Sequence, residues 1–348
     1  MVDPIHPYFM QRAIELAAKG AGRVAPNPLV GCVIVHDGQI IGEGYHEQFG
    51  AAHAEVNAIA SVGRKELLEN STLYVTLEPC AHFGKTPPCS DHILENRIPR
   101  VVIGCRDPFS EVNGKGIEQL RNAGVDVETS VLSEECRWLN RRFFTFHEKN
   151  RPYVILKWAQ SADGFMDIDR TSGQLGSFMI SSEETQVQVH RWRAEEAAIL
   201  IGKNTFINDN PSLTVRKAQG RNPVRILLSA RDILVEGSQL NSNEAPTLVL
   251  TNATEKVVAG VRYLSCGNVH EPHLVLNALF QENILSVLVE GGATVLRSFL
   301  KSGLWDEARI ISANDSLGAG LIAPFIDIPS AVEEKSGTDI IRSYFNRP

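Results

Sequence analysis

The sequence has no apolar stretch approaching the roughly 18 uninterrupted residues that a membrane helix requires. Residues 1–10 also lack the apolar core of a signal peptide. The net charge of −7 leaves no basic excess with which to track a phosphate backbone, which argues against a nucleic-acid partner. We therefore expect a cytoplasmic protein that binds neither membrane nor nucleic acid.

Cysteine is scarce, with six residues in 348. Because a secretory signal is also lacking, the sequence argues against a disulfide framework. A G-x-G-x-x-G motif is also absent, so a standard Rossmann dinucleotide site is not indicated. The chain is 43% hydrophobic and 22% charged, which is typical of a globular protein, and it is long enough for two domains.

Three short stretches carry metal-site chemistry. His53-Ala54-Glu55, Pro79-Cys80 and a second cysteine, Cys89, follow one another in the order used by zinc deaminases of nucleobases. Catalytic zinc keeps three protein ligands and an open position for water, so His53, Cys80 and Cys89 are the expected ligands. Glu55 is then free to carry protons between the water, the ring nitrogen and the departing amine.

Helix geometry restricts where this histidine can lie. Residues i and i+2 are about 200° apart on a regular helix, so His53 and Glu55 cannot face one centre from its middle. We therefore predict that His53 lies at a helix start. Cys80 follows a predicted buried strand, 73–77, and Cys89 precedes a helix opening, where the dipole favours a thiolate.

A closed structural zinc site is the main alternative, with His82 as its fourth ligand, but such a site leaves Glu55 without a role. Two further alternatives stay open: a nucleoside or nucleic-acid deaminase fused to an unrelated domain, and a zinc-stabilised binding module without chemistry. Cys32, Cys105 and Cys266 lie in apolar runs and are predicted core residues.

Alternating helix and strand patterns predict a three-layer α/β/α domain over residues 1–147. The expected helices are 7–20, 53–68, 89–97, 113–123 and 133–145, and the expected strands 30–36, 39–44, 73–77, 100–104 and 125–129. The polar, Pro-terminated stretch 148–152 is the predicted linker. A second α/β domain is predicted over 151–348, where strand 284–290 runs through Gly291-Gly292 into helix 293–302.

Residues 76–89, TLEPCAHFGKTPPC, and residues 26–34, PNPLVGCVI, closely resemble the bifunctional deaminase-reductase of riboflavin biosynthesis. The second half resembles the reductase half of the same family at Lys157, 161–164, 198–202, 211–216 and 290–292. The resemblance implies a cytidine-deaminase-like domain followed by a dihydrofolate-reductase-like α/β domain. It also implies Zn²⁺ and NADPH as cofactors and a small-molecule pyrimidine ribosyl phosphate as substrate; a homo-oligomer is left open.

Family roles carried to matching positions assign the remaining site residues. The NADPH contacts would be Gln160, Met179, Thr205, Asp209, Ser229, Gly291, Gly292, Ala293, Thr294, Val295, Leu296 and Arg297. The substrate contacts would be Ser177, Arg193, Leu213, Arg216 and Glu290, with the arginines at its phosphate. The chain departs from the family at Phe178-Met179, where the family commonly has a polar residue and tryptophan, and at Gln160, where it commonly has a small residue.

One cofactor residue is inferred from the chain itself. Strand 224–228 ends at Ser229, and Arg231 follows two residues later, at a strand end that faces the ligand crevice in open α/β sheets. We predict that Ser229 and Arg231 take the 2′-phosphate that distinguishes NADPH from NADH. The alternative is a solvated Arg231 paired with Asp232.

Overall fold

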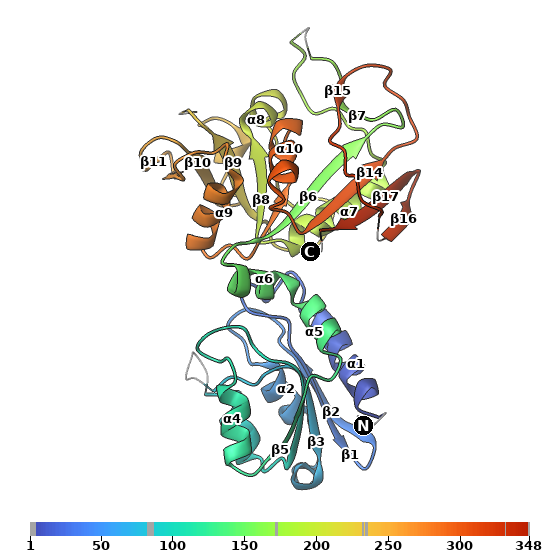
Figure 1. The fold of residues 1–348 in the computed structure, drawn as a ribbon, viewed down its shortest axis with the longest axis vertical. Coiled ribbons are helices and arrows are strands. Elements are labelled where there is room, and N and C mark those ends of the chain that lie inside the picture. The colour runs from blue at the N-terminus through green and yellow to red at the C-terminus, as the bar shows by residue number, and fades with distance from the viewer. Residues whose placement is uncertain are drawn as a thin grey trace. The chain divides into compact units, whose positions relative to one another are not determined.

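The computed structural model describes residues 5–81, 87–170, 173–231, 233, 236–330 and 332–346. The chain divides into two compact units, Met1–Lys149 and Asn150–Pro348, each of which has its own sheet (Figure 1). Among the described residues, no helix combines the length and the apolar character needed to cross a membrane. His82, the candidate fourth zinc ligand, lies outside the described residues.

The first unit is built on a five-stranded sheet in the order β2-β1-β3-β4-β5. Its strands are β1 (Gly31–His36), β2 (Gln39–Tyr45), β3 (Thr72–Leu77), β4 (Arg100–Cys105) and β5 (Asp126–Thr129). β1 pairs antiparallel with β2 and β3, whereas β3, β4 and β5 are parallel. The carboxyl ends of β3 and β4 therefore lie at the same edge of the sheet, and Cys80 follows the end of β3 there.

Helices cover both faces of this sheet, as predicted. α1 (Ile5–Ala18) and α5 (Ser133–Leu139) pack on one face, and α2 (Ala54–Ser61), α3 (Cys89–Glu95) and α4 (Lys115–Asn122) lie on the other. The packing is close, because a Cβ atom at Gly31 would lie 2.0 Å from the carbonyl oxygen of Ala13 in α1. Cys32 and Cys105 are buried in this unit, as predicted for core residues, and Cys136 is buried as well.

Two predicted helices are interrupted. The helix expected over 53–68 ends at Ser61, Gly63 follows, and a separate 3₁₀ helix covers Lys65–Asn70. The helix expected over 133–145 divides into α5 and α6 (Arg141–Lys149), because the side chain of Asn140 turns back to the backbone of Leu29. The break at Asn140 depends on a long-range contact that the apolar periodicity does not report.

A ten-stranded sheet forms the centre of the second unit, in the order β11-β12-β10-β9-β8-β13-β6-β14-β17-β16. The seven strands from β12 to β14 run parallel, and antiparallel strands complete both edges. The strands are β6 (Tyr153–Gln160), β8 (Ala198–Gly202), β9 (Val224–Ser229), β10 (Thr247–Thr251), β11 (Lys256–Val258), β12 (Val261–Ser265), β13 (Ser286–Val289), β14 (Glu307–Ser312), β16 (Val332–Ser336) and β17 (Asp339–Phe345).

Alternate residues of these parallel strands supply two apolar layers. Val154, Leu156 and Trp158 of β6 face the layer that includes α9 (Pro272–Gln281) and α10 (Ala293–Ser302). Ile155, on the opposite face, joins the layer covered by α7 (Glu183–Glu195), and α8 (Lys203–Asp209) packs beside β8 and β9. A small sheet of β7 (Phe165–Asp167) and β15 (Leu321–Ile322) extends from this unit. Because seven strands of the large sheet are parallel, the loops that follow their carboxyl ends lie at the same edge of the sheet.

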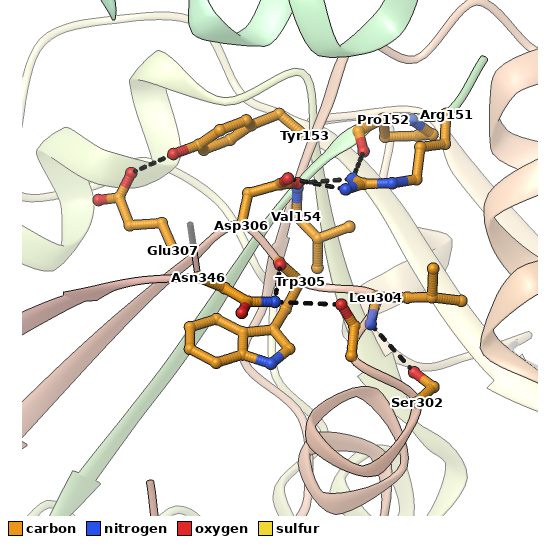
Figure 2. A network of polar contacts seen from close by, with 11 residues as sticks. Arg151, Pro152, Tyr153, Val154, Ser302, Leu304, Trp305, Asp306, Glu307 and Asn346 are labelled. Carbon is orange, nitrogen blue, oxygen red and sulfur yellow. Dashed lines mark hydrogen bonds and ion pairs between the residues drawn. The ribbon is translucent and has the colours of Figure 1, made fainter. Parts of the chain in front are cut away.

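The predicted linker is shorter in the structure than the expected 148–152. Glu148 and Lys149 are the last residues of α6. Arg151 belongs to the second unit, where its guanidinium makes two bonds of 2.6 and 2.7 Å to the Asp306 carboxylate, which also accepts the backbone N–H of Val154 (Figure 2). A mostly buried ion pair thus holds the start of the second unit against Asp306, the residue before β14 (Glu307–Ser312).

We predict that fragments 1–149 and 150–348 fold separately, because each carries its own apolar core and Arg151 stays with Asp306. The first fragment should release ammonia from the deaminase substrate, and the second should oxidise NADPH with the deaminated product. Far-UV circular dichroism and the two assays check this. Insoluble or inactive fragments would show that each half needs the other or a homo-oligomer.

Candidate functional site

The three predicted metal ligands converge in the first unit from three elements. His53 is the N-cap residue of α2, in extended conformation with φ −73° and ψ 165°, which confirms its predicted place at a helix start. Cys80 follows β3 after two residues, and Cys89 is the first residue of α3. Helix starts and a strand end therefore direct one imidazole and two thiols toward a common point.

The ligand atoms have the spacing that a zinc ion requires. Nδ1 of His53 lies 3.2 Å from Sγ of Cys89 and 3.6 Å from Sγ of Cys80, and the three atoms lie within 4.8 Å of one another. Zn–N and Zn–S bonds of about 2.0–2.3 Å in tetrahedral geometry place ligand atoms about 3.5 Å apart. The donor set and its spacing both fit a zinc ion with one position left for water.

Hydrogen bonds and burial shift the pKa values of the side chains in and beside this cluster. A hydrogen bond from the Cys89 thiol lowers the pKa of Cys80 to about 4, together with one bond and the charge of His53 and a bond from the Cys89 backbone, although burial opposes the shift. The Cys89 backbone N–H also points at Cys80 Sγ, 3.4 Å away. Glu55, in the first turn of α2, is 3% exposed, and burial raises its pKa. The carboxyl therefore lies beside the ligand cluster with a raised proton affinity.

A second histidine, missed by the motif analysis, lies against the ligand histidine. His46 is buried, and its ring contacts that of His53 edge-on at 5.5 Å. Its Nδ1 donates to the Ala52 carbonyl at 3.0 Å, and its Nε2 lies 3.1 Å from Nδ2 of Asn27. Burial lowers the pKa of His46, so it is neutral near pH 7. The signal that could have found Asn27 was its place in the PNPLVG stretch.

A buried acid beside Cys80 orders the neighbouring loop. The Glu78 carboxylate accepts backbone N–H bonds of 2.9 to 3.3 Å from four residues, Asp107, Gly114, Gly116 and Ile117. Burial raises the pKa of Asp107 to about 7, with the charges of Glu78 and Cys80 contributing. Neither role has a local signal near Glu78, because the loop lies 29 or more residues downstream.

The second site is a cavity of about 1310 Å³ at the carboxyl ends of β6, β8, β9 and β13. Thirteen of the predicted contacts line it: Ser177, Met179, Arg193, Thr205, Asp209, Leu213, Arg216, Ser229, Glu290, Gly292, Ala293, Thr294 and Val295. The cavity also contains residues without a predicted role, among them Lys157, Arg170, His190 and Lys203. Its place at the strand ends is the one expected of an open parallel sheet.

Four predicted cofactor contacts lie behind or beside the cavity wall. Gln160 accepts a hydrogen bond of 2.9 Å from the Trp158 indole, and Leu296 is buried in the core. Gly291 backs onto β8, where a Cβ atom would lie 2.3 Å from Cα of Ile201. Arg297 is exposed and donates to the carbonyl of Ile322. These four residues shape the site through its scaffold, whereas Gly292 lies at the start of α10 with a φ of +57° that favours glycine.

Glu290 is the electrostatic centre of the cavity wall. Arg193 donates to both carboxylate oxygens, at 2.8 and 2.7 Å, and Nζ of Lys157 lies 3.8 Å away. Burial alone raises the pKa of Glu290, but these two cations outweigh it and hold the value at about 2. The guanidinium of Arg193 is therefore largely committed to Glu290, which limits what it can offer to a phosphate.

Arg216 presents a freer cation. Its guanidinium bonds within the described residues go to the hydroxyls of Ser212 and Thr214, and its side chain is exposed at the cavity. Its backbone N–H donates to Nδ1 of His190 at 3.0 Å, and burial together with nearby cations lowers the pKa of His190 to about 4. A neutral imidazole thus fixes the loop that carries Arg216.

Comparison with known proteins agrees with both sites. The family of the cytidine and deoxycytidylate deaminase zinc-binding region matches residues 4–105, and the RibD C-terminal domain family matches residues 152–330. The riboflavin biosynthesis protein RibD of Aquifex aeolicus is 41% identical over 340 residues, covering 96% of this chain and 94% of the relative. The chain belongs to the RibD family.

Other members of the RibD family support the same assignment. RibD of Escherichia coli is 35% identical, covering 90% of this chain and 88% of its own. The crystal structure of a diaminohydroxyphosphoribosylaminopyrimidine deaminase/5-amino-6-(5-phosphoribosylamino)uracil reductase from Thermotoga maritima has a TM-score of 0.86 at 38% identity, covering 97% of this chain and 98% of that one. RibD from Acinetobacter baumannii has a TM-score of 0.87 at 33% identity, covering 98% of each chain.

The chain is accordingly a bifunctional enzyme of riboflavin biosynthesis, with a zinc-binding deaminase domain and a reductase domain. The predicted fold class, a cytidine-deaminase-like domain followed by a reductase α/β domain, is confirmed. Zn²⁺ and NADPH, the cofactors expected from the sequence, fit these two domains, and the cluster of His53, Cys80 and Cys89 is a candidate metal site.

Proposed function

We propose that the first domain hydrolyses the amino group from the ring of 2,5-diamino-6-ribosylamino-4(3H)-pyrimidinone 5′-phosphate, and that the second domain reduces the ribosyl group of the product. The final product would be 5-amino-6-ribitylamino-uracil 5′-phosphate. The observation that carries the proposal is the pairing, within one RibD-family chain, of a three-ligand cluster beside Glu55 with a cation-lined cavity at the strand ends of a second domain.

In the deaminase site, Glu55 is the residue that moves protons. Zinc, when held by His53, Cys80 and Cys89, lowers the pKa of a water to about 7 and so supplies the nucleophile. Glu55 takes one proton from the attacking water and delivers it to the ring nitrogen. It then takes the second proton from the hydroxyl now bound to the ring carbon and delivers it to the amine, which leaves as ammonia while the ring carbonyl forms. His46, neutral and fixed by the Ala52 carbonyl, keeps the imidazole of His53 in place from one side.

In the reductase site, the protein supplies orientation and charge. NADPH, when bound, donates the hydride to C1′ of the ring-opened ribosyl group. The start of α10, from Gly292 to Val295, offers free backbone N–H groups to the phosphates of the cofactor. Arg216 receives the substrate phosphate, and the ionised Glu290 accepts hydrogen bonds from sugar hydroxyls.

The purified full-length chain, given the pyrimidinone phosphate and NADPH, tests the proposal when ammonia release and NADPH oxidation are followed separately. We expect ammonia without NADPH, and NADPH oxidation only after deamination. Ammonia from cytidine or an adenosine-containing RNA, but not from the pyrimidinone phosphate, would favour the nucleoside or nucleic-acid deaminase instead. Metal removal that unfolds the first domain, without turnover of any substrate, would favour a zinc-stabilised binding module.

Selection of NADPH over NADH is predicted to depend on Arg231. Arg231 and Lys203 line the cavity at the adjacent ends of β9 and β8. The Ser229 hydroxyl donates to the carbonyl of Arg231 at 2.6 Å, so Ser229 supports the turn more than the ligand. Asp232, the alternative partner of Arg231, lies outside the described residues.

Arg231→Ala is expected to weaken NADPH binding by about tenfold or more, because a charge-assisted bond contributes about 1.5–3 kcal/mol. NADH binding should change far less. Fluorescence titration of both cofactors measures the difference, with Arg191→Ala on the exposed side of α7 as the control. Equal losses for the two cofactors would assign the 2′-phosphate to other residues.

We also propose that the enzyme acts in the cytoplasm on its small-molecule substrate, without a nucleic-acid or membrane partner. The net charge of −7 supports this for nucleic acid. The sequence leaves a homo-oligomer open, and sedimentation analysis of the purified chain decides between a monomer and an oligomer.

A further inference from the structure

Arg170 uses every N–H donor of its guanidinium. Nε and Nη2 bind the two carboxylate oxygens of Asp167 at 2.6 and 3.0 Å, and Nη2 also binds Oδ1 of Asp209 at 3.1 Å. Nη1 donates to the carbonyls of Gln174 and Gly176 at 3.1 and 3.0 Å. A guanidinium has five N–H groups, so the residue has no donor left for a ligand.

These bonds join three parts of the reductase domain. Asp167 ends β7, Asp209 ends α8, and the two carbonyls belong to the segment 173–180, which leads along the cavity to α7. One further bond, from the N–H of Gly176 to the carbonyl of Asn208 at 2.7 Å, ties the segment to α8. Ser177 to Ile180 line the cavity, and so does Asp209.

Burial of apolar surface does not hold this segment in place. Leu175 is 69% exposed, Met179 58% and Phe178 40%. A chain with such exposed side chains gains little hydrophobic stabilisation, so its conformation depends on polar contacts. The side chain of Arg170, by contrast, is only 12% exposed.

The arginine also separates two carboxylates. Asp167 and Asp209 share its guanidinium, and the charge of each would repel the other without it. Burial raises the pKa of Asp209, an effect that Arg170 counters and Asp167 reinforces. Loss of the arginine would therefore remove the two carbonyl bonds and also push β7 away from α8.

We propose that Arg170 is a positioning residue of the reductase site. It holds the segment 173–180 against α8 and so determines the shape of the cavity wall on which NADPH and the ribosyl phosphate bind. The inference rests on the proposed reductase function for the identity of these ligands. It requires no contact between Arg170 and either ligand, because all of its donors are engaged within the protein.

Arg170→Met in the full-length chain tests the proposal with three measurements. Hydrogen exchange of residues 173–180 should become faster, and both the Kd for NADPH and the KM for the deaminated substrate should rise by about tenfold to a hundredfold, with kcat falling less. Ammonia release should be unchanged. Arg262→Met, which removes an exposed two-bond pair with Glu282, is the matched control and should leave all three values as in the parent chain.

Two more variants distinguish positioning from other roles. Arg170→Met with Asp167→Asn removes the repulsion and should recover part of the NADPH affinity and of the exchange protection. Arg170→Lys keeps the charge but not the geometry that reaches five acceptor oxygens, and its exchange and affinity should lie between those of the parent and of Arg170→Met. Hydrogen exchange of residues 173–180 that is unchanged in both Arg170→Met and Arg170→Lys would overturn the proposal. If NADPH affinity is lost while this exchange stays as in the parent chain, Arg170 contacts the ligand directly, which would also overturn it. If the parent chain binds no NADPH, the proposed reductase function is refuted. Hydrogen exchange of residues 173–180 in the parent and in Arg170→Met would then still test whether Arg170 holds this segment.

Discussion

Glu55→Gln is expected to lower ammonia release by at least about a hundredfold, the scale of lost general acid–base catalysis, while zinc stays bound. The amide has nearly the same shape as the carboxyl, so the first turn of α2 should be preserved. The ligand cluster consists of His53, Cys80 and Cys89, and the buried Glu55 lies beside it. Metal analysis and the ammonia assay on the same preparation measure the two effects.

Cysteine variants supply the controls for this experiment. Cys80→Ser and Cys89→Ser should lose zinc together with deamination, because each removes one of three ligands. Cys266→Ser, at a buried cysteine of the second unit, should keep both. NADPH oxidation with the deaminated substrate should be unaffected in Glu55→Gln. Zinc loss in Glu55→Gln would make Glu55 a ligand and remove the proton carrier from the mechanism.

The clustering of His53, Cys80 and Cys89 could be predicted from the sequence, because these candidate ligands lie in short motifs with fixed chemistry. The position of His53 followed from helix geometry alone, since a residue two places before Glu55 must leave the helix to face the same ion. The supporting residues could not be predicted in this way. Glu78 meets its four N–H donors only because β3 and β4 are parallel neighbours, and His46 reaches His53 only through the β1–β2 hairpin.

Beyond residue 302 the sequence pattern of the second domain predicts no helix or strand. β14 contains Glu307 and Arg309, which look like surface residues in the sequence. In the structure both are buried, with Nε of Arg309 2.6 Å from the Glu307 carboxylate and the guanidinium over the Trp192 ring. Charges that neutralise each other two residues apart hide the apolar alternation on which strand prediction depends. β16 is largely exposed and carries no such alternation.

The pairing of Arg193 with Glu290 is another long-range result, because 97 residues separate them. From the sequence, Arg193 was expected at the substrate phosphate. Its two bonds to Glu290 instead indicate that it holds a buried carboxylate ionised, which leaves Arg216 as the more available cation for the phosphate. The same geometry predicts a large loss of stability when this arginine is removed.

Arg193→Met should lower the free energy of unfolding of the reductase domain by about 3–5 kcal/mol at pH 7, because removing one partner leaves a buried charge. Lys157, 3.8 Å away, only partly compensates Glu290. Urea unfolding followed by tryptophan fluorescence reports mainly on this domain, since Trp158, Trp192 and Trp305 belong to it. Arg342→Met, which removes an exposed pair with Glu333, is the control and should cost no more than about 1 kcal/mol.

The pH dependence of this loss identifies its cause. In the parent chain the pKa of Glu290 is lowered from 4.5 to about 2, so its pairing contributes stability above pH 4.5 that is lost as the pH falls toward 2. In Arg193→Met the burial that raises this pKa is largely unopposed, so the folded domain takes up a proton more readily than the unfolded chain. The variant should therefore gain stability relative to the parent as the pH falls from 7 toward 4. A difference in unfolding free energy that stays constant over this range would show that lost packing of the Arg193 side chain, and not the charge of Glu290, determines the loss.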